Sequence, residues 1–217
     1  MCYEEKLFLP DGFIVFISGV PGVGKTTISY ELLRRINLFR IIEETDLIRE
    51  VLRGYNSFLE HEFPAQSRDI LERIRITDHN KLLSLDEAKQ QCEFMRSSFE
   101  YIVGRQKRKG IPSIINGVHI IPEALNGLAD NHNVIYINLY IHSEQSLYTR
   151  LVDRNPESYM INHVPFIFQT NNELYTSTEK LSKKYPYVFN NIDITELSID
   201  ETIYKIVQLI RHLLCKD

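Results

Sequence analysis

The chain has 217 residues, which is enough for one full-sized core, so we expect a single domain over residues 1–217. Its 25 basic and 29 acidic residues leave a mildly negative chain, which argues against attraction to nucleic acid or an anionic membrane and favours a small solute as partner. The three cysteines are widely spaced without a C-x-x-C pair, and no apolar run approaches the roughly 20 residues of a membrane span. We therefore expect a cytoplasmic protein without a disulfide framework or a zinc site.

The first elements are a strand and a helix joined by a glycine-rich loop. Residues 13–18 (FIVFIS) form the short apolar run of a strand buried on both faces, and residues 25–36 carry apolar side chains at helical spacing. Between them, GVPGVGKT has the pattern G-x-x-x-x-G-K-[ST]. In that setting the pattern predicts a phosphate-binding loop (P-loop), whose backbone N–H groups surround the phosphates of a nucleoside triphosphate.

The P-loop predicts ATP and Mg²⁺ as cofactors, although it does not decide between ATP and GTP. Lys25 is expected to act catalytically by bridging the terminal phosphates, and the hydroxyl of Thr26 to ligate Mg²⁺. The predicted cofactor-binding residues are Gly19, Val20, Pro21, Gly22, Val23, Gly24, Lys25, Thr26 and Thr27.

A second strand, residues 39–44, leads to a candidate acceptor site. Asp46 opens a helix at the carboxyl end of this strand, where ligands of a doubly wound sheet bind. We predict that Asp46 faces the P-loop and accepts the proton of an attacking hydroxyl, while Arg49 and Arg53 on the same helical face bind a carboxylate or phosphate of the acceptor. The alternative is that Thr45 or Asp46 merely caps the helix and the arginines are solvated.

The remaining chain alternates between helices and strands. We read residues 54–85 as helical pieces with a break near Pro64, and residues 55–85 as a cap over the acceptor site. A long helix is predicted over residues 86–110. Its terminal cations suit the negative end of the helix dipole better than they suit a phosphate patch. These cations are Arg105, Lys107, Arg108 and Lys109.

The later strands are expected at residues 112–117, 133–141 and 187–190, and a closing helix at residues 200–214. Asn190 and Asn191 should then end the last strand, where they either read the base or form a turn. Alternation of strands and helices predicts an α/β fold with right-handed crossovers. We expect a P-loop NTPase kinase-type three-layer sandwich, with about five parallel strands, helices on both faces and a helical lid.

The predicted lid covers residues 142–184. Arg150 and Arg154 lie four residues apart after the fourth strand, and small kinases use arginines there to close over the transferred phosphoryl group. We predict catalytic roles for both. The alternative is an exposed helical face.

Four stretches of the chain together resemble the 2-phosphoglycerate kinases, which are ATP-dependent small-molecule kinases of the P-loop class. They are the P-loop, TDLIREVLR (45–53), QQCEFMRSSFEYIVGRQKRKG (90–110) and NGVHIIPE (116–123). The resemblance implies transfer of the γ-phosphate of ATP to the free hydroxyl of 2-phosphoglycerate beneath a mobile lid. It also implies that Gly117 and His119 bind substrate together with Asp46, Arg49 and Arg53. His119 either hydrogen-bonds a substrate phosphate or supports the loop.

The chain departs from the family pattern at two places. Asn116 stands where the family has an acid, which removes a charge from the Mg²⁺ shell, and residues 166–175 (FIFQTNNELY) lack an expected arginine. We therefore predict an ATP-dependent kinase for a small acidic or phosphorylated metabolite similar to 2-phosphoglycerate. Two alternatives remain open: a kinase of a nucleotide or a nucleic-acid 5′ end, and a P-loop nucleotide-binding switch with weak turnover. The sequence specifies neither the acceptor nor the oligomeric state.

Overall fold

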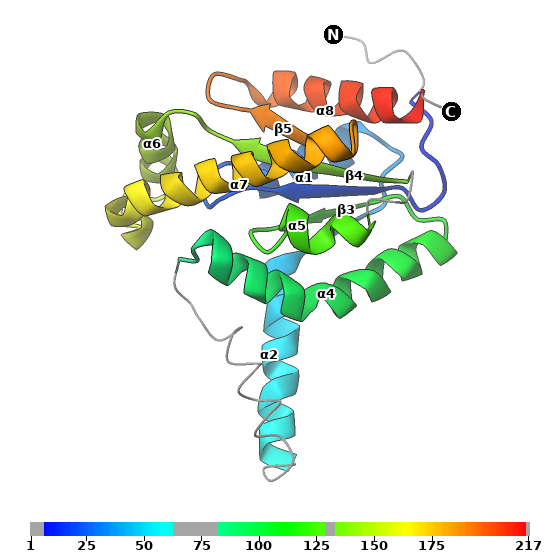
Figure 1. Cartoon of the computed structure of the whole chain (residues 1–217), viewed down its shortest axis with the longest axis horizontal. Helices are drawn as coiled ribbons and strands as arrows, with labels where there is room; N and C mark the ends of the chain where they lie inside the picture. The colour runs from blue at the N-terminus through cyan, green and yellow to red at the C-terminus, as the bar shows by residue number, and fades with distance from the viewer. Residues whose placement is uncertain (1–6, 63–81, 129–132, 216–217) are drawn as a thin grey trace.

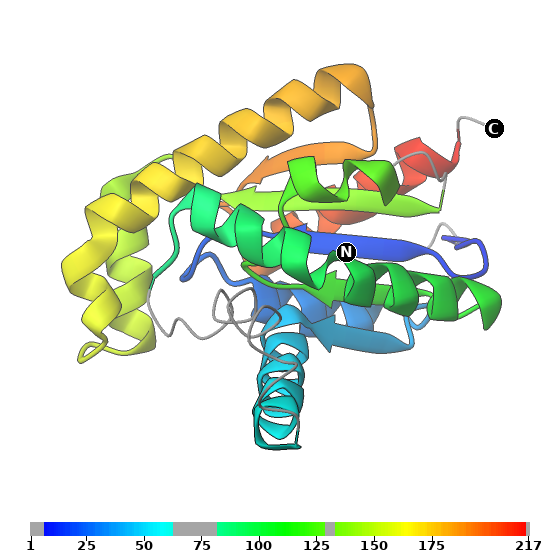
Figure 2. The same ribbon diagram turned by 60° about the horizontal axis from the view of Figure 1, so that its bottom comes forward.

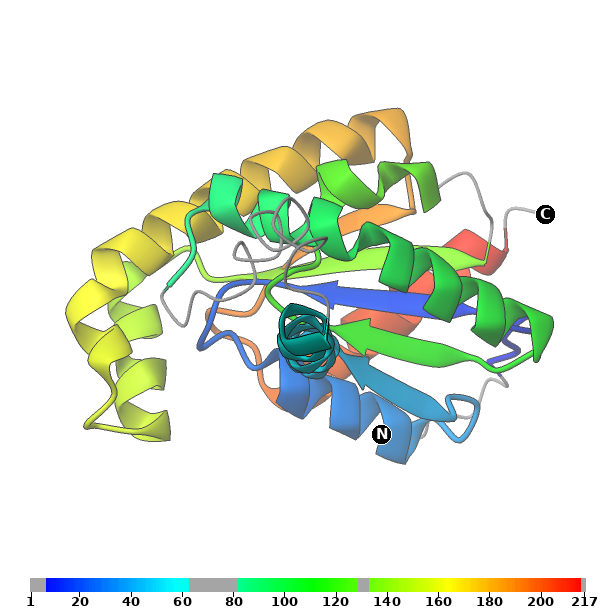
Figure 3. The ribbon, with the colours of Figure 1, turned by 90° about the horizontal axis from the view of Figure 1, so that it is seen from below.

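The computed structural model of the chain describes residues 7–62, 82–128 and 133–215. Its centre is a five-stranded sheet in the order β2-β3-β1-β4-β5, in which every pair of neighbours is parallel (Figure 3). The strands are β1 (Ile14–Ser18), β2 (Ile41–Glu44), β3 (Ser113–Asn116), β4 (Val134–Tyr140) and β5 (Phe189–Asp193). The predicted five-stranded parallel sheet is thus confirmed.

Helices cover both faces of the sheet (Figure 1). One face carries α1 (Lys25–Arg35) and α8 (Ile199–Leu214), and the other carries α4 (Leu85–Arg108), α5 (Pro122–Leu125) and part of α7 (Val164–Lys184). The other helical elements are α2 (Thr45–Glu62), η2 (Asn126–Leu128), α6 (Glu144–Arg154) and η3 (Tyr159–His163). Most of α2 projects away from the body of the molecule (Figures 1 and 2).

Alternation along β1 divides the core into two hydrophobic clusters. Val15 and Ile17 pack toward α1 and α8, whereas Ile14 and Phe16 pack toward α4 and α5. Because successive side chains of a strand point to opposite faces, a strand between two helical layers must be apolar at every position. All five residues of β1 are buried, which explains the continuous apolar run in the sequence.

The long helix α4 follows its predicted course. It begins after Ser84, whose hydroxyl accepts a hydrogen bond from the Glu87 N–H while the Glu87 carboxylate accepts one from the Ser84 N–H. This capping box satisfies two backbone donors that helix geometry leaves unpaired. Gly110, just past the helix, has a positive φ of 64°, which glycine adopts readily.

The last strand differs from the prediction. β5 covers Phe189–Asp193, so Asn190 and Asn191 lie inside it rather than at its end. The prediction was wrong because polar side chains usually mark a turn, whereas here each amide finds a partner. The amide of Asn191 accepts a hydrogen bond from Asn138 on β4 at 2.8 Å and donates one to the Tyr175 carbonyl at 3.1 Å.

Two other expectations concern residues that the structure does not describe. Residues 63–81, most of the predicted cap, lie outside the described residues, and so does the expected break near Pro64. Within the described ranges, we find no helix with the length and apolar character needed to cross a membrane.

Candidate active site

The P-loop connects β1 to α1 at the carboxyl end of the central strand. Gly19, Gly22 and Gly24 have φ values of 139°, 91° and 83°, which lie in the region that L side chains rarely adopt. A Cβ on Gly19 would also approach the Leu139 carbonyl oxygen to 2.5 Å. Among the described residues no side chain caps the start of α1, and the first turn of this helix contains no acid. The backbone N–H groups and the positive end of the helix dipole are therefore left to an anion.

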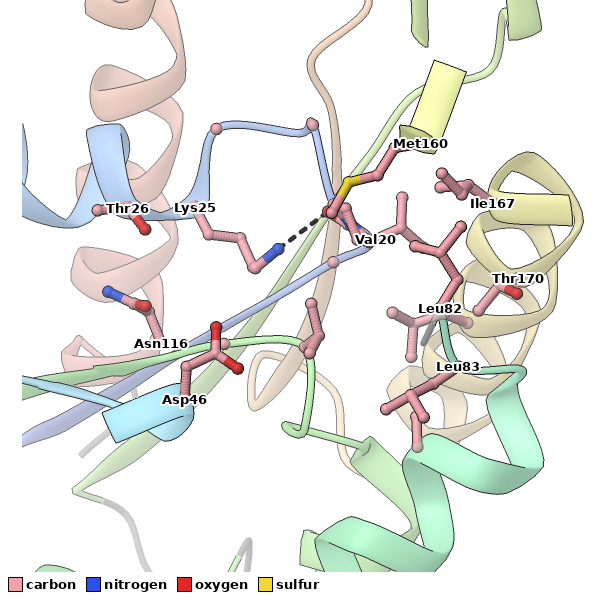
Figure 4. A pocket seen from close by; sticks show the side chains of 18 of the residues that line it. Val20, Lys25, Thr26, Asp46, Leu82, Leu83, Asn116, Met160, Ile167 and Thr170 are labelled. Atoms are coloured by element: carbon pink, nitrogen blue, oxygen red, sulfur yellow. Dashed lines mark hydrogen bonds between the residues drawn. The ribbon is translucent and has the colours of Figure 1, made fainter. Parts of the chain in front are cut away.

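Lys25 begins α1 and lies across its own loop. Its ammonium donates a hydrogen bond to the Val20 carbonyl at 2.9 Å (Figure 4). Burial lowers the pKa of Lys25 to about 8; the Asp46 carboxylate opposes this shift and Arg154 adds to it. Bound phosphate would supply the negative charge that a buried ammonium lacks.

The P-loop borders a cavity of about 890 Å³, a volume within the range of ligand sites. The predicted residues that line it are Gly19, Val20, Pro21, Gly22, Gly24, Lys25, Thr26, Thr27, Asp46, Arg49, Gly117, Arg150 and Arg154. Of the remaining predicted residues, Val23 and His119 are buried in the core beside the cavity. Arg53 does not line the cavity as described, and its guanidinium bonds to the Glu50 carboxylate at 3.0 Å.

Asp46 and Arg49 stand together in the first turns of α2. The Asp46 carboxylate is 60% exposed, and its Oδ1 lies 3.9 Å from Arg49 Nη2. Arg49 also contacts Glu50 at 3.1 Å, yet its buried Nε atom has no hydrogen-bond partner among the described residues. The buried Nε–H of Arg49 is therefore a donor that the described residues leave without an acceptor. Asp46 follows β2 directly, as predicted, and reaches the cavity that contains Lys25.

Thr45 packs closely against the loop that follows β3. The Thr45 hydroxyl hydrogen-bonds Nδ1 of His119 at 3.0 Å, and the same Nδ1 lies 3.7 Å from Asp46 Oδ1. Burial lowers the pKa of His119 to about 4, so the ring is neutral at neutral pH. Gly117 fits against Thr45 only because it lacks a side chain, since a Cβ there would lie 1.7 Å from Thr45 Oγ1. The contacts of His119 match the loop-supporting role that the sequence left open.

Glu44 is a cavity residue that the sequence analysis missed. It ends β2 and pairs in register with Asn116 at the end of β3, and both residues line the cavity. The Asn116 side chain is buried, and its Nδ2 has no hydrogen-bond partner in the described part of the chain. The position of Glu44 at the carboxyl end of a parallel strand could have indicated its place in the site.

The predicted lid arginines differ in their contacts. Arg150 on α6 donates a hydrogen bond to the Ile194 carbonyl at 2.6 Å, which links α6 to the segment after β5. Arg154, at the end of α6, is exposed and acts electrostatically on Lys25 across the cavity. The lid boundaries at 142 and 184 remain a prediction.

The fold and the loop together define the class of protein. A P-loop between a central parallel strand and its helix, in a three-layer α/β sandwich, is the architecture of P-loop kinases. In agreement, the solved structure of a gluconokinase from Sinorhizobium meliloti 1021 matches this chain with a TM-score of 0.55 and 14% identity, over 93% of each chain. That likeness concerns the fold alone.

Sequence comparison then gives the family resemblance. The chain is 28% identical to a 2-phosphoglycerate kinase of Methanococcus maripaludis strain C7 over 219 residues, covering 95% of this chain and 67% of the relative. It is 26% identical to the enzyme so named from Methanocaldococcus jannaschii over 216 residues, covering 93% of this chain and 64% of that protein. No protein-family model matches. The chain is thus similar to proteins named 2-phosphoglycerate kinase, the family that its motifs resemble, and it spans about two thirds of the length of the proteins it matches.

Proposed function

We propose that the chain is an ATP- and Mg²⁺-dependent kinase that transfers the γ-phosphate to a hydroxyl of a small anionic metabolite. The observation that carries the proposal is the placement of Lys25 and Asp46 on two walls of one cavity, one from the P-loop and one from α2 (Figure 4). A phosphate cradle opposite an exposed carboxylate is the arrangement that phosphoryl transfer to a hydroxyl requires. The names of the relatives support a kinase reaction on a small molecule.

The nucleotide would take the P-loop, with its phosphates on the backbone N–H groups and on Lys25. The described oxygen donors beside the loop suit Mg²⁺, which prefers oxygen ligands and usually uses one or two carboxylates together with substrate phosphates. Thr26, Glu44 and Asn116 line that part of the cavity and would hold the ion directly or through water. Bound Mg²⁺ would neutralise charge on the phosphates.

The acceptor would lie beside the first turns of α2. Its hydroxyl oxygen forms the new bond to the γ-phosphorus, the bond from that phosphorus to the β-phosphate bridging oxygen breaks, and the hydroxyl proton passes to the Asp46 carboxylate. Arg49 binds an anionic group of the acceptor, and Arg154 adds positive charge as the phosphoryl group moves. Positioning and charge neutralisation account for the catalysis.

Phosphorus NMR of the purified protein with Mg²⁺-ATP tests the proposal. The acceptors to compare are 2-phosphoglycerate, 3-phosphoglycerate, glycerate, shikimate and a nucleoside monophosphate. A new phosphoester signal that depends on the acceptor, and that the Lys25→Ala variant does not produce, supports a kinase. New phosphoanhydride signals of a nucleoside diphosphate, seen with the nucleoside monophosphate alone, would support a nucleotide kinase. Tight ATP binding without ester formation or hydrolysis would support a nucleotide switch.

A further inference from the structure

His119 is buried next to the carboxylate that would take the proton of the acceptor hydroxyl. Its Nδ1 hydrogen-bonds the Thr45 hydroxyl at 3.0 Å and lies 3.7 Å from Oδ1 of Asp46. The two oxygens belong to the first two residues of α2, and both face the same ring nitrogen. A proton on that nitrogen therefore acts on both side chains.

The protonation of the ring decides what it offers to these oxygens. Burial lowers the pKa of His119 to about 4, against the opposing effect of Asp46, so the ring is neutral at neutral pH and carries one proton. If that proton were on Nε2, the lone pair of Nδ1 would face the negative charge of Asp46, which is repulsive. With the proton on Nδ1, the N–H donates to Thr45 and its positive end faces the carboxylate. The contacts thus favour the tautomer that carries its proton on Nδ1.

The segment that carries His119 is held from the sheet. The carbonyl of Ile120, the next residue, accepts hydrogen bonds from the Ser18 hydroxyl at 2.6 Å and from the Tyr136 hydroxyl at 2.8 Å. Ser18 ends β1, Tyr136 lies in β4, and both are buried. Two hydrogen bonds from central strands restrict the movement of this carbonyl, so the imidazole beside it has a fixed place.

The Asp46 carboxylate needs an external support because it is 60% exposed. Two described groups approach its Oδ1: His119 Nδ1 at 3.7 Å and Arg49 Nη2 at 3.9 Å. Contacts of catalytic groups are often long in a structure without substrate and shorten in the complex. Because both groups stabilise negative charge on Oδ1, the proton of an acceptor binds more readily to Oδ2.

We propose that His119 is a positioning residue for phosphoryl transfer, whose Nδ1–H, together with the Thr45 hydroxyl, turns the Asp46 carboxylate so that Oδ2 faces the acceptor hydroxyl. This inference rests on the proposed kinase function and adds a residue to it. In the transfer, the hydroxyl oxygen bonds to the γ-phosphorus, the bond from that phosphorus to the bridging oxygen of ADP breaks, and the hydroxyl proton moves to Oδ2. His119 keeps its own proton and does not touch the acceptor.

The tautomer of His119 can be measured without any turnover. Nitrogen-15 NMR of the imidazole rings distinguishes a neutral ring protonated on Nδ1 from one protonated on Nε2. Comparison with the His119→Asn variant assigns the signals of His119 among those of the 7 histidines. At pH 7 we expect a proton on Nδ1 and a changed Nδ1 shift in Asp46→Asn. A proton on Nε2, or an Nδ1 shift that Asp46→Asn leaves unchanged, would overturn the inference.

Three substitutions of His119 separate positioning from packing. His119→Leu removes both ring nitrogens, His119→Asn places an amide N–H near the position of Nδ1, and His119→Gln places one near Nε2. The assay is ADP release with the acceptor that forms an ester in the phosphorus NMR series. We expect kcat to fall about ten- to a hundredfold in His119→Leu and His119→Gln, while His119→Asn recovers most of it. The acceptor KM and the dissociation constant of ATP should stay within about threefold.

The other outcomes separate this inference from its alternatives. Thermal unfolding first checks that each variant is folded at the assay temperature. An equal fall of kcat in His119→Asn and His119→Leu would mean that the ring only fills space, and a raised acceptor KM at unchanged kcat would mean that it binds the acceptor. Either result would overturn the positioning role while the kinase function stood. If no acceptor formed an ester, the proposed function would fail, and the tautomer with its response to Asp46→Asn would still decide whether His119 orients Asp46.

Discussion

Gly117→Ala should disturb both the stability of the fold and the position of Asp46. The φ of Gly117 is +153°, in a region that L side chains rarely adopt, and the new Cβ would lie 1.7 Å from Thr45 Oγ1 and 2.8 Å from Thr45 Cβ. A strained backbone conformation costs about 1–3 kcal/mol, and overpacking of a tight core costs about 1–3 kcal/mol more. We therefore expect the free energy of unfolding to fall by roughly 2–6 kcal/mol. Because Thr45 must move, Asp46 next to it should move as well, and kcat should fall.

Thermal unfolding and acceptor-dependent ADP release measure the two effects. At about 2–4 °C per kcal/mol for a chain of this size, the melting temperature should fall by roughly 4–24 °C. Gly54→Ala is the matched control, because a Cβ on Gly54 in α2 meets nothing within 4 Å. That variant should be neutral or gain up to about 1 kcal/mol, since alanine favours helix more than glycine does.

A double-variant cycle tests the cause. Thr45→Ala removes the hydroxyl that the new Cβ would strike, so the pair Gly117→Ala and Thr45→Ala should lose less stability than the two single losses added together. Strict additivity, or a melting temperature for Gly117→Ala equal to that of the unmodified protein, would refute the reasoning from this contact.

Four further outcomes follow from the site. Asp46→Asn should lower kcat by about 10²–10⁴-fold and leave the dissociation constant of ATP nearly unchanged; equal losses in both would indicate a structural cap. Arg49→Ala should raise the acceptor KM about ten- to a hundredfold, whereas Arg53→Ala should not, and equal effects would place the acceptor elsewhere. The pKa of Lys25 is about 8, so its ammonium loses its proton above that pH and calorimetric ATP affinity should fall up to about tenfold between pH 7 and pH 9; a flat profile would argue against a charged Lys25 in phosphate binding. Glu44→Gln should raise the Mg²⁺ concentration needed for half-maximal turnover, and an unchanged titration curve would exclude Glu44 from the metal shell.

The phosphate side of the site could be predicted because backbone conformation creates it. Gly19, Gly22 and Gly24 are required by positive φ values, and Lys25 begins the helix that follows. Such requirements fix residue types at fixed spacings within one short segment, so a sequence shows them directly. The layered fold could be predicted from the sequence for a similar reason, because burial on both faces of the sheet makes β1 apolar at every position.

The acceptor side of the candidate site was harder to predict from the sequence, because it is formed by side chains from segments that are far apart in the chain. Arg49 and Arg53 look equivalent in the sequence, and both bond the Glu50 carboxylate, so only their rotation around α2 decides that Arg49 lines the cavity and Arg53 does not. His119 matched a substrate-binding phrase, yet the fold buries its ring against Thr45. The predicted boundaries of β5 were wrong for the same reason, since the partners of Asn191 lie on β4 and α7.

The register of the sheet changes what Asn116 implies for the negative charge available at the Mg²⁺ site. Considered alone, an amide in place of an acid removes negative charge from the metal shell and favours a nucleotide switch over a kinase. In the parallel sheet, however, Asn116 pairs with Glu44 at the same edge, and both line the cavity that contains Thr26. Register partners on neighbouring parallel strands point to the same side of the sheet. The carboxylate of Glu44 on β2 can therefore supply the negative charge that an acid at position 116 on β3 would supply to Mg²⁺. Asn116 is therefore a weak argument against catalysis in this chain, and its Nδ2, which has no hydrogen-bond partner among the residues that the structure describes, is a donor suited to a phosphate oxygen.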